Sequence, residues 1–119
     1  MATHNELGLL GEQMAIDYLV KQGFTIREQN WYFQKAEVDI IAQKGELLAV
    51  IEVKTRSTRM YGDPQNFVSD KKIKLLTKAI DHYIIIEDLD VEVRFDVIAI
   101  VKNRYETSIN HLEDAFFHF

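Results

Sequence analysis

The chain has no cysteine, a single proline and only five glycines among its 119 residues. The lack of cysteine excludes disulfides, zinc–thiolate sites and cysteine nucleophiles. So little proline and glycine, with a hydrophobic content of 47%, argues against disorder or linkers. No hydrophobic run approaches the roughly 20 residues of a membrane span, and residues 1–6 lack the features of a signal peptide. We therefore expect a single domain over residues 1–119, soluble and cytoplasmic, without membrane contact.

Positive charge is also scarce overall, and half of it lies in one segment. The formal net charge of −5 argues, by itself, against binding to nucleic acid. Residues 54–78, however, carry seven basic and two acidic residues, a charge of +5, while the remaining seven basic and seventeen acidic residues sum to −10. A local basic zone suits a polyanionic partner. The alternative is an ordinary solvated loop and helix surface.

Two hydrophobic runs, residues 37–43 and 47–54, flank a short turn and are rich in β-branched residues, which is typical of strands. A two-residue loop at Gly45-Glu46, with glycine first, predicts a type II′ hairpin turn. In that register Lys44 pairs with Leu47, and every further pair follows by counting.

Counting places Asp39 directly opposite Glu52, with their Cβ atoms roughly 5 Å apart, and puts Lys54 on the same face because side chains alternate along a strand. Two carboxylates beside an ammonium group, at the end of a hydrophobic hairpin, make little structural sense without a cation. Mg²⁺ is usually held by one or two carboxylates, waters and substrate phosphate, so we expect a Mg²⁺ or Mn²⁺ ion here. The alternative is an acid pair at a solvated end of the sheet, with Lys54 as its salt-bridge partner.

The rest of the chain reads as an α/β fold, a mixed sheet with helices packed on it, in the order α-β-β-β-α-β with a short C-terminal extension. A capping box at residues 3–6 and a C-cap at Gly23 delimit the first helix. The further elements that we expect are a strand over 24–33, a loop over 55–66, a helix capped by Ser69 or Asp70, a strand over 91–101 and a last strand over 105–110.

This order, with Asp39 on one strand and Glu52-Val53-Lys54 on the next, resembles the PD-(D/E)xK nuclease superfamily and its restriction-endonuclease-like core. More closely, the chain resembles the YraN family of small bacterial proteins, which are endonuclease-like and of unassigned function. One departure is Ala36, where that family usually has glycine, and it predicts a local change in the loop. The residues that carry the resemblance are Gly11, Glu12, Ala15, Tyr18, Leu19, Gly23, Asn30, 37–42, 50–54, Arg56, Gly62, Pro64, Val68, Lys71 and 94–98.

The resemblance implies a metal-dependent nuclease that hydrolyses phosphodiester bonds in DNA. Asp39 and Glu52 would be metal ligands, and Lys54 would orient the attacking water and offset charge in the transition state. The chain is also similar to archaeal Holliday-junction resolvases, which add an acid from the first helix. Glu12 would take that part as a further metal ligand, and the substrate would then include branched or structured DNA. A merely solvated glutamate is the alternative for Glu12.

Arg56, Lys71 and Lys72 are the residues that we expect to bind nucleic acid. Lysines at the start of a helix oppose its dipole, which favours a functional role for Lys71. The alternative function is a non-catalytic nucleic-acid-binding module on the same fold, and a third and weaker one is a protein-interaction domain. A protein that only binds nucleic acid would gain nothing from two carboxylates that face phosphate, which favours the enzyme.

Several residues are expected to be structural. Arg94 and Asp96 share a face of their strand and predict an ion pair. The four histidines are scattered without ligand-like spacing, and we expect them at the surface. Three phenylalanines close the chain and predict either a cover for the core or a homodimer face. These two groups are His4, His82, His111 and His118, and Phe116, Phe117 and Phe119.

Overall fold

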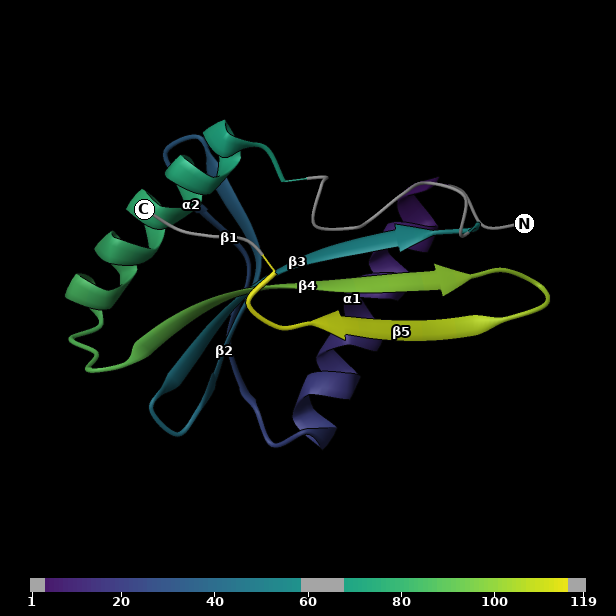
Figure 1. The fold of residues 1–119 in the computed structure, drawn as a ribbon, viewed down its shortest axis with the longest axis horizontal. Helices are drawn as coiled ribbons and strands as arrows, with labels where there is room; N and C mark the ends of the chain where they lie inside the picture. Colours follow the sequence, from purple (N-terminus) through teal and green to yellow (C-terminus); the bar gives the residue numbers. More distant parts are fainter. Residues whose placement is uncertain (1–3, 59–67, 116–119) are drawn as a thin grey trace.

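The computed structural model of the chain describes residues 4–58 and 68–115. Five strands form one mixed sheet in the order β1-β2-β3-β4-β5, in which only β3 and β4 run parallel (Figure 1). The expected order is confirmed, and the C-terminal extension supplies a fifth strand. The elements are α1 His4–Lys21, β1 Thr25–Phe33, β2 Ala36–Lys44, β3 Leu47–Arg56, α2 Asp70–Ile86, β4 Glu92–Lys102 and β5 Thr107–Leu112.

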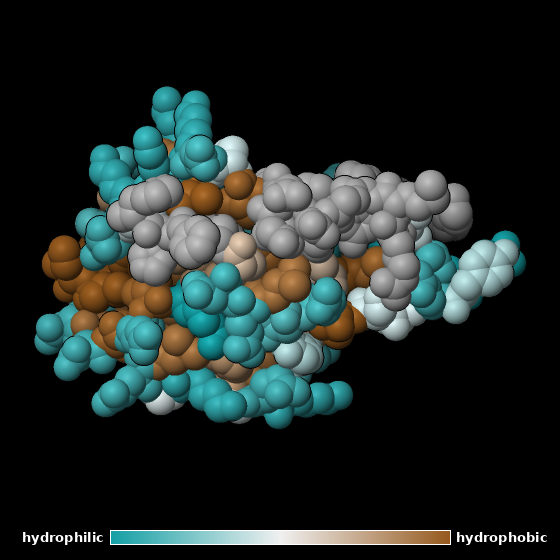
Figure 2. Space-filling view, viewed as in Figure 1, coloured by the Kyte–Doolittle hydropathy of each residue, from teal (hydrophilic) through white to brown (hydrophobic). Residues whose placement is uncertain are grey.

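The two helices pack on opposite faces of the sheet, each through its own hydrophobic cluster (Figure 1). Under α1, Ala15 and Leu19 meet the side chains of three strands. Under α2, the stripe from Ile73 to Tyr83 meets the other face. Hydrophobic side chains also gather on the surface where α2 ends (Figure 2). Ile85 and Ile86, the last two residues of α2, are 76% and 62% exposed and lie outside the packed stripe. Neither described helix has the length and hydrophobicity that crossing a membrane requires.

Local signals in the sequence set the ends of these elements. Gly23 has a φ of 95°, and its N–H donates to Val20 O while that of Phe24 donates to Leu19 O, which is the Schellman cap expected for α1. Ser69 caps α2, since its Oγ accepts a hydrogen bond from Lys72 N. Gly45 has a φ of 60° in the turn between β2 and β3, which fits the predicted glycine-first turn.

Other expectations were wrong in detail or lie outside the described residues. The loop predicted from residue 55 starts later because β3 continues to Arg56, and the last strand lies two residues further along than predicted. Ala36 is a buried strand residue without positive φ, so this position does not need glycine here. The Thr3 cap, Gly62, Pro64 and the three C-terminal phenylalanines lie outside the described residues.

A buried ionic cluster ties β4 to β5 and to α1. Asp96 is fully buried, and Arg94 donates to both of its carboxylate oxygens at 2.8 and 2.9 Å, which confirms the predicted ion pair. His111 Nε2 lies 2.7 Å from Asp96 Oδ2, and Tyr18 Oη lies 3.0 Å from His111 Nδ1. Burial alone would raise the pKa of Asp96, but hydrogen bonds from His111 and Arg94 hold that pKa below its ordinary value. The surface position predicted for His111 was therefore wrong, because β5 aligns it with a buried carboxylate.

Gly11 allows α1 to approach β3 more closely than any other residue would. A Cβ atom at Gly11 would lie 2.8 Å from the Cβ and Cγ2 of Thr55, too close for either helix or strand to stay in place. At Gly8, one turn earlier, a Cβ atom would meet nothing within 4 Å. The close contact at Gly11 places the next residue, Glu12, beside the C-terminal end of β3.

We predict opposite effects for alanine at these two glycines. Gly11→Ala forces α1 away from Thr55 and should lower the free energy of unfolding by about 1–3 kcal/mol, as overpacking does. Gly8→Ala should raise it by about 0.4–1 kcal/mol, because the unfolded chain loses conformational freedom. Urea denaturation of both variants tests this, and equal effects of the same sign would contradict the close approach.

Candidate metal centre

The regular pairing of β2 stops at Asp39. The β2–β3 pairs run from Lys44↔Leu47 to Ile40↔Ile51, as predicted, and end there. The next predicted pair, Asp39 directly opposite Glu52, is not formed. Val38 packs in the cluster under α2 whereas Ile40 packs in the cluster under α1, although residues two apart on a regular strand share a face. The strand is therefore irregular at Asp39.

The Asp39 side chain takes over a backbone position in the sheet. Its Oδ2 accepts a hydrogen bond from Val53 N at 2.8 Å, so a carboxylate stands where a strand carbonyl would otherwise pair. On the other side of β2, Asn30 of β1 has a φ of 50°. At the level of Asp39, β1 as well as β2 thus departs from regular strand geometry, and the Asp39 carboxylate lies between β2 and β3.

Glu52 is nearly buried and carries two ammonium groups on one oxygen. Its side chain is 6% exposed, and its Oε1 lies 3.3 Å from Lys54 Nζ and 2.5 Å from Lys72 Nζ. Lys54 lies two residues further along β3, whereas Lys72 comes from the first turn of α2. The structure therefore brings Glu52 and Lys54 together, as predicted, and adds Lys72, whose contact with Glu52 the sequence did not predict.

Glu52 lies close enough to Asp39 for its negative charge to affect the pKa of the Asp39 carboxyl. Burial, and next the negative charge of Glu52, raise the pKa of Asp39 to about 7, although the Val53 N–H bond opposes the shift. The charge of Glu12 adds to the shift, and that of Lys72 opposes it. A cation between the two carboxylates would remove the repulsion, so the pair is suited to hold one.

A cavity of about 270 Å³ connects Asp39 to α1. Burial, and then the charge of Glu37, raise the pKa of Glu12, while a hydrogen bond from Asn30 opposes this and the charge of Glu52 adds to it. The negative charges of Glu37 and Glu52 in the sheet therefore affect the pKa of Glu12 on α1. The cavity is lined by Gly8, Glu12, Asn30, Glu37, Asp39, Val53, Lys54, Thr55 and Arg56.

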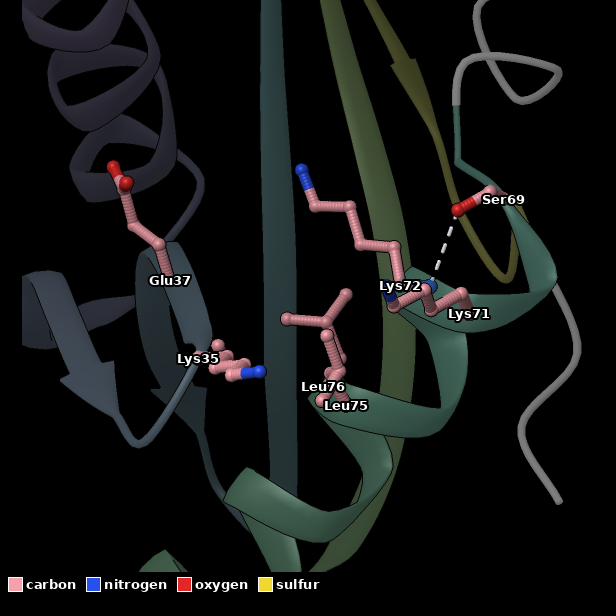
Figure 3. A pocket seen from close by; sticks show the side chains of 8 residues that line it. Lys35, Glu37, Ser69, Lys71, Lys72, Leu75 and Leu76 are labelled. Carbon is pink, nitrogen blue, oxygen red and sulfur yellow. Dashed lines mark hydrogen bonds between the residues drawn. The ribbon is translucent and has the colours of Figure 1, made fainter.

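A second cavity, of about 300 Å³, lies on the side of α2 (Figure 3). Lys71 and Lys72 come from the first turn of the helix, and Lys35 comes from the β1–β2 turn. Glu37 lines both cavities. Of the residues expected to bind nucleic acid, Arg56 therefore lies in the first cavity, and Lys71 and Lys72 lie in the second. The lining residues are Lys35, Ala36, Glu37, Ser69, Lys71, Lys72, Leu75 and Leu76.

The donor set fits a hard divalent cation held by two carboxylates. Within residues 4–58 and 68–115, no three acidic or histidine side chains converge as ready-made metal ligands. Mg²⁺ needs only one or two carboxylates and completes its octahedron with water and phosphate, so Asp39 and Glu52 would suffice. Glu12 lines the same cavity as Asp39. Metal ligation by Asp39, Glu52 and Glu12 stays a prediction.

Comparison with known proteins places this arrangement in a family. The uncharacterised protein family UPF0102 matches residues 11–100, which include every acid of the candidate site. The chain belongs to this family. UPF0102 is the YraN family, a group related to the PD-(D/E)xK nucleases, so the resemblance of the sequence is confirmed.

Members of UPF0102 from several bacteria match the whole chain. The chain is 56% identical to UPF0102 proteins of Flavobacterium psychrophilum and of Christiangramia forsetii, in both cases over the full length of both proteins. It is 43% identical to the UPF0102 protein of Phocaeicola vulgatus over 98% of this chain and 97% of that one.

The raised pKa of Asp39 predicts a loss of stability with rising pH. Because the folded chain binds this proton more tightly than the unfolded chain does, the free energy of unfolding should fall between about pH 4 and about pH 7. Asp39→Asn keeps an acceptor for Val53 N but has no charge. It should raise Tm above about pH 7, leave Tm nearly unchanged near pH 4 and flatten the dependence in between.

Thermal denaturation over this pH range measures the effect. Asp17→Asn, at an exposed position of α1, is the control and should keep the pH dependence of the wild type. An Asp39→Asn protein with the same dependence as the wild type would contradict the assignment of the titration to Asp39.

Proposed function

We propose that this UPF0102 protein is a Mg²⁺- or Mn²⁺-dependent nuclease that hydrolyses phosphodiester bonds in DNA, branched and structured DNA included. One observation carries the proposal. The Asp39 carboxylate is buried against that of Glu52 at a break in the sheet, which raises its pKa to about 7. Such a pair is costly for a structural site and useful for one that takes up a divalent cation.

Asp39 and Glu52 would hold the metal ion. Bound there, the ion would lower the pKa of a water molecule and neutralise charge on the phosphate. The hydrogen bond from Val53 N fixes the Asp39 carboxylate before any substrate arrives, and preorganisation of this kind lowers the cost of reaching the transition state.

Lys54 would act on the reacting phosphate from the same strand. Its ammonium group lies 3.3 Å from Glu52 Oε1, within reach of any group that approaches this carboxylate. From there it orients the attacking water and stabilises the negative charge that develops on the phosphate oxygens. Glu12, from α1, would add a second point of attachment for metal or for a metal-bound water.

The substrate backbone would follow the basic residues on either side of the acids. Arg56 lines the cavity that holds Asp39, and Lys71 lines the cavity beside α2. Positive charge on both sides of a phosphodiester would offset the negative charge of Glu12, Asp39 and Glu52.

A non-catalytic nucleic-acid-binding module is the second candidate. The observation that favours it is the neutralisation of Glu52 by two lysines, which would let phosphate approach without a metal ion. In this alternative the acids have a structural role, and the basic residues bind the phosphates.

Neutralising either acid should separate the two functions. Asp39→Asn and Glu52→Gln should abolish cleavage, because each removes a metal ligand. Both variants should bind DNA in the absence of metal as well as the wild type or better, because a negative charge facing phosphate is gone. Lys54→Ala should reduce the cleavage rate by about 10²–10³-fold, since its task lies in the transition state.

The assay measures cleavage of linear, single-stranded, flap and four-way-junction DNA with Mg²⁺ or Mn²⁺. Asp81→Asn, at an exposed position of α2, is the control and should cleave like the wild type. A wild-type protein that binds these DNAs without cutting any of them would refute the nuclease and leave the binding module.

Removing charge at Lys71 should weaken DNA binding without disturbing the acids. Lys71→Gln should lower affinity, and the slope of log Kd against log salt should fall by about one unit for the lost phosphate contact. Lys78→Gln, on the same helix but outside the cavity, is the matched control. Fluorescence anisotropy across a salt series measures Kd for both variants. Identical slopes for the two would contradict a phosphate contact at Lys71.

A further inference from the structure

Lys72 reaches from α2 into the centre of the candidate metal site. Ser69 caps the helix by accepting from the backbone N of Lys72, which fixes the first turn. From this fixed point the Lys72 side chain extends across the cavity toward β3 (Figure 3), where its Nζ lies 2.5 Å from Glu52 Oε1. Lys71, its neighbour, is exposed, and among the residues that the structure describes no ion pair joins it to an acid.

The Lys72 ammonium already lies against one oxygen of the carboxylate that would hold the cation. Glu52 Oε1 already faces Lys54 Nζ at 3.3 Å, and a divalent ion beside two ammonium groups would meet strong repulsion at this distance. A metal ion that binds Glu52 Oε1 would therefore displace one of the two lysines.

The surroundings of the two lysines indicate which one leaves. Lys54 belongs to β3, is paired with β4 along its backbone, and has a side chain that is 20% exposed. The Lys72 side chain is 35% exposed and borders the cavity of about 300 Å³ that Lys35 and Lys71 also line. Lys72 has space to move into, and the move leaves the backbone of α2 in place.

We infer that Lys72 is a tethered cation that occupies the cation position at Glu52 in the metal-free protein and leaves it when a divalent metal ion binds. The released ammonium group joins Lys35 and Lys71 in the adjacent cavity, where it adds to the charge that meets substrate phosphate. This inference rests on the metal site of the proposed function. It makes Lys72 a positioning residue that keeps Glu52 in place without metal and links metal binding to the basic surface.

Mn²⁺ affinity tests the exchange without any need for cleavage. Isothermal titration with Mn²⁺ alone should give a Kd about fivefold lower for Lys72→Gln than for the wild type, because no ion pair must be broken. Lys71→Gln, one residue away, should stay within about twofold of the wild type, because its charge is distant and screened.

Each other outcome of the titration has a definite meaning. If the wild type binds Mn²⁺ and Lys72→Gln binds it equally or more weakly, the exchange is refuted and the metal site stands. If neither binds Mn²⁺ although both are folded by circular dichroism, the metal site and the proposed nuclease are refuted together with the exchange.

The reactivity of the lysine amines gives a second measurement on the wild-type protein. With an acetylating reagent and peptide mass spectrometry, Lys72 should react more slowly than Lys71 without metal and approach the rate of Lys71 when Mg²⁺ is added. Lys78, outside the site, should not change and serves as the internal control. In Glu52→Gln, Lys72 should react fast without Mg²⁺. An acetylation rate at Lys72 that changes neither with Mg²⁺ nor in Glu52→Gln would overturn the inference.

Discussion

The hydrogen bond from Val53 N to the Asp39 carboxylate is the contact on which the candidate site depends. It satisfies a strand N–H with a side chain, so the β2–β3 ladder can end at Ile40↔Ile51 without leaving a buried donor unpaired. The bond also turns the Asp39 carboxylate inward, toward Glu52. Because Val38 and Ile40 are anchored in clusters on opposite faces, the irregular strand cannot relax into a regular one without exposing one of them.

The charges of the candidate site lower the free energy of unfolding, and the rest of the fold must offset this loss. Burial raises the pKa of Asp39 to about 7, and the charge of Glu52 adds to the shift, so an ionised Asp39 destabilises the folded chain near neutral pH. At Asp96 the balance is the reverse, since Arg94 and His111 lower the pKa of a carboxylate that is fully buried. One buried acid is fully compensated by its neighbours and stabilises the sheet. The other is left short of positive charge, which is common where stability is given up for function.

The features that the sequence predicted are those determined by neighbouring residues. Gly45 sets the hairpin register, Gly23 ends α1 and Ser69 starts α2, each through backbone geometry within a few residues. Contacts between distant segments were not predictable in this way. The pairing of Lys72 with Glu52 depends on how α2 crosses the sheet, and that of His111 with Asp96 depends on the alignment of β5 with β4. The irregularity of β2 at Asp39 was not predicted either, because the alternation of side chains assumes a regular strand.

The two helices bring opposite charges to the same break in the sheet. On one face α1 presents Glu12, held close by the missing side chain of Gly11, and on the other face α2 presents Lys72, held by its Ser69 cap. In the proposed function, the acids would hold the metal ion, and the lysines beside α2 would meet the phosphate chain. Of the basic residues in the segment 54–78, Lys71 and Lys72 line the cavity beside α2, whereas Lys54 and Arg56 line the cavity that holds Asp39. In the proposed function, a phosphate chain that enters from the side of α2 would meet Lys71 and Lys72 before it meets the acids.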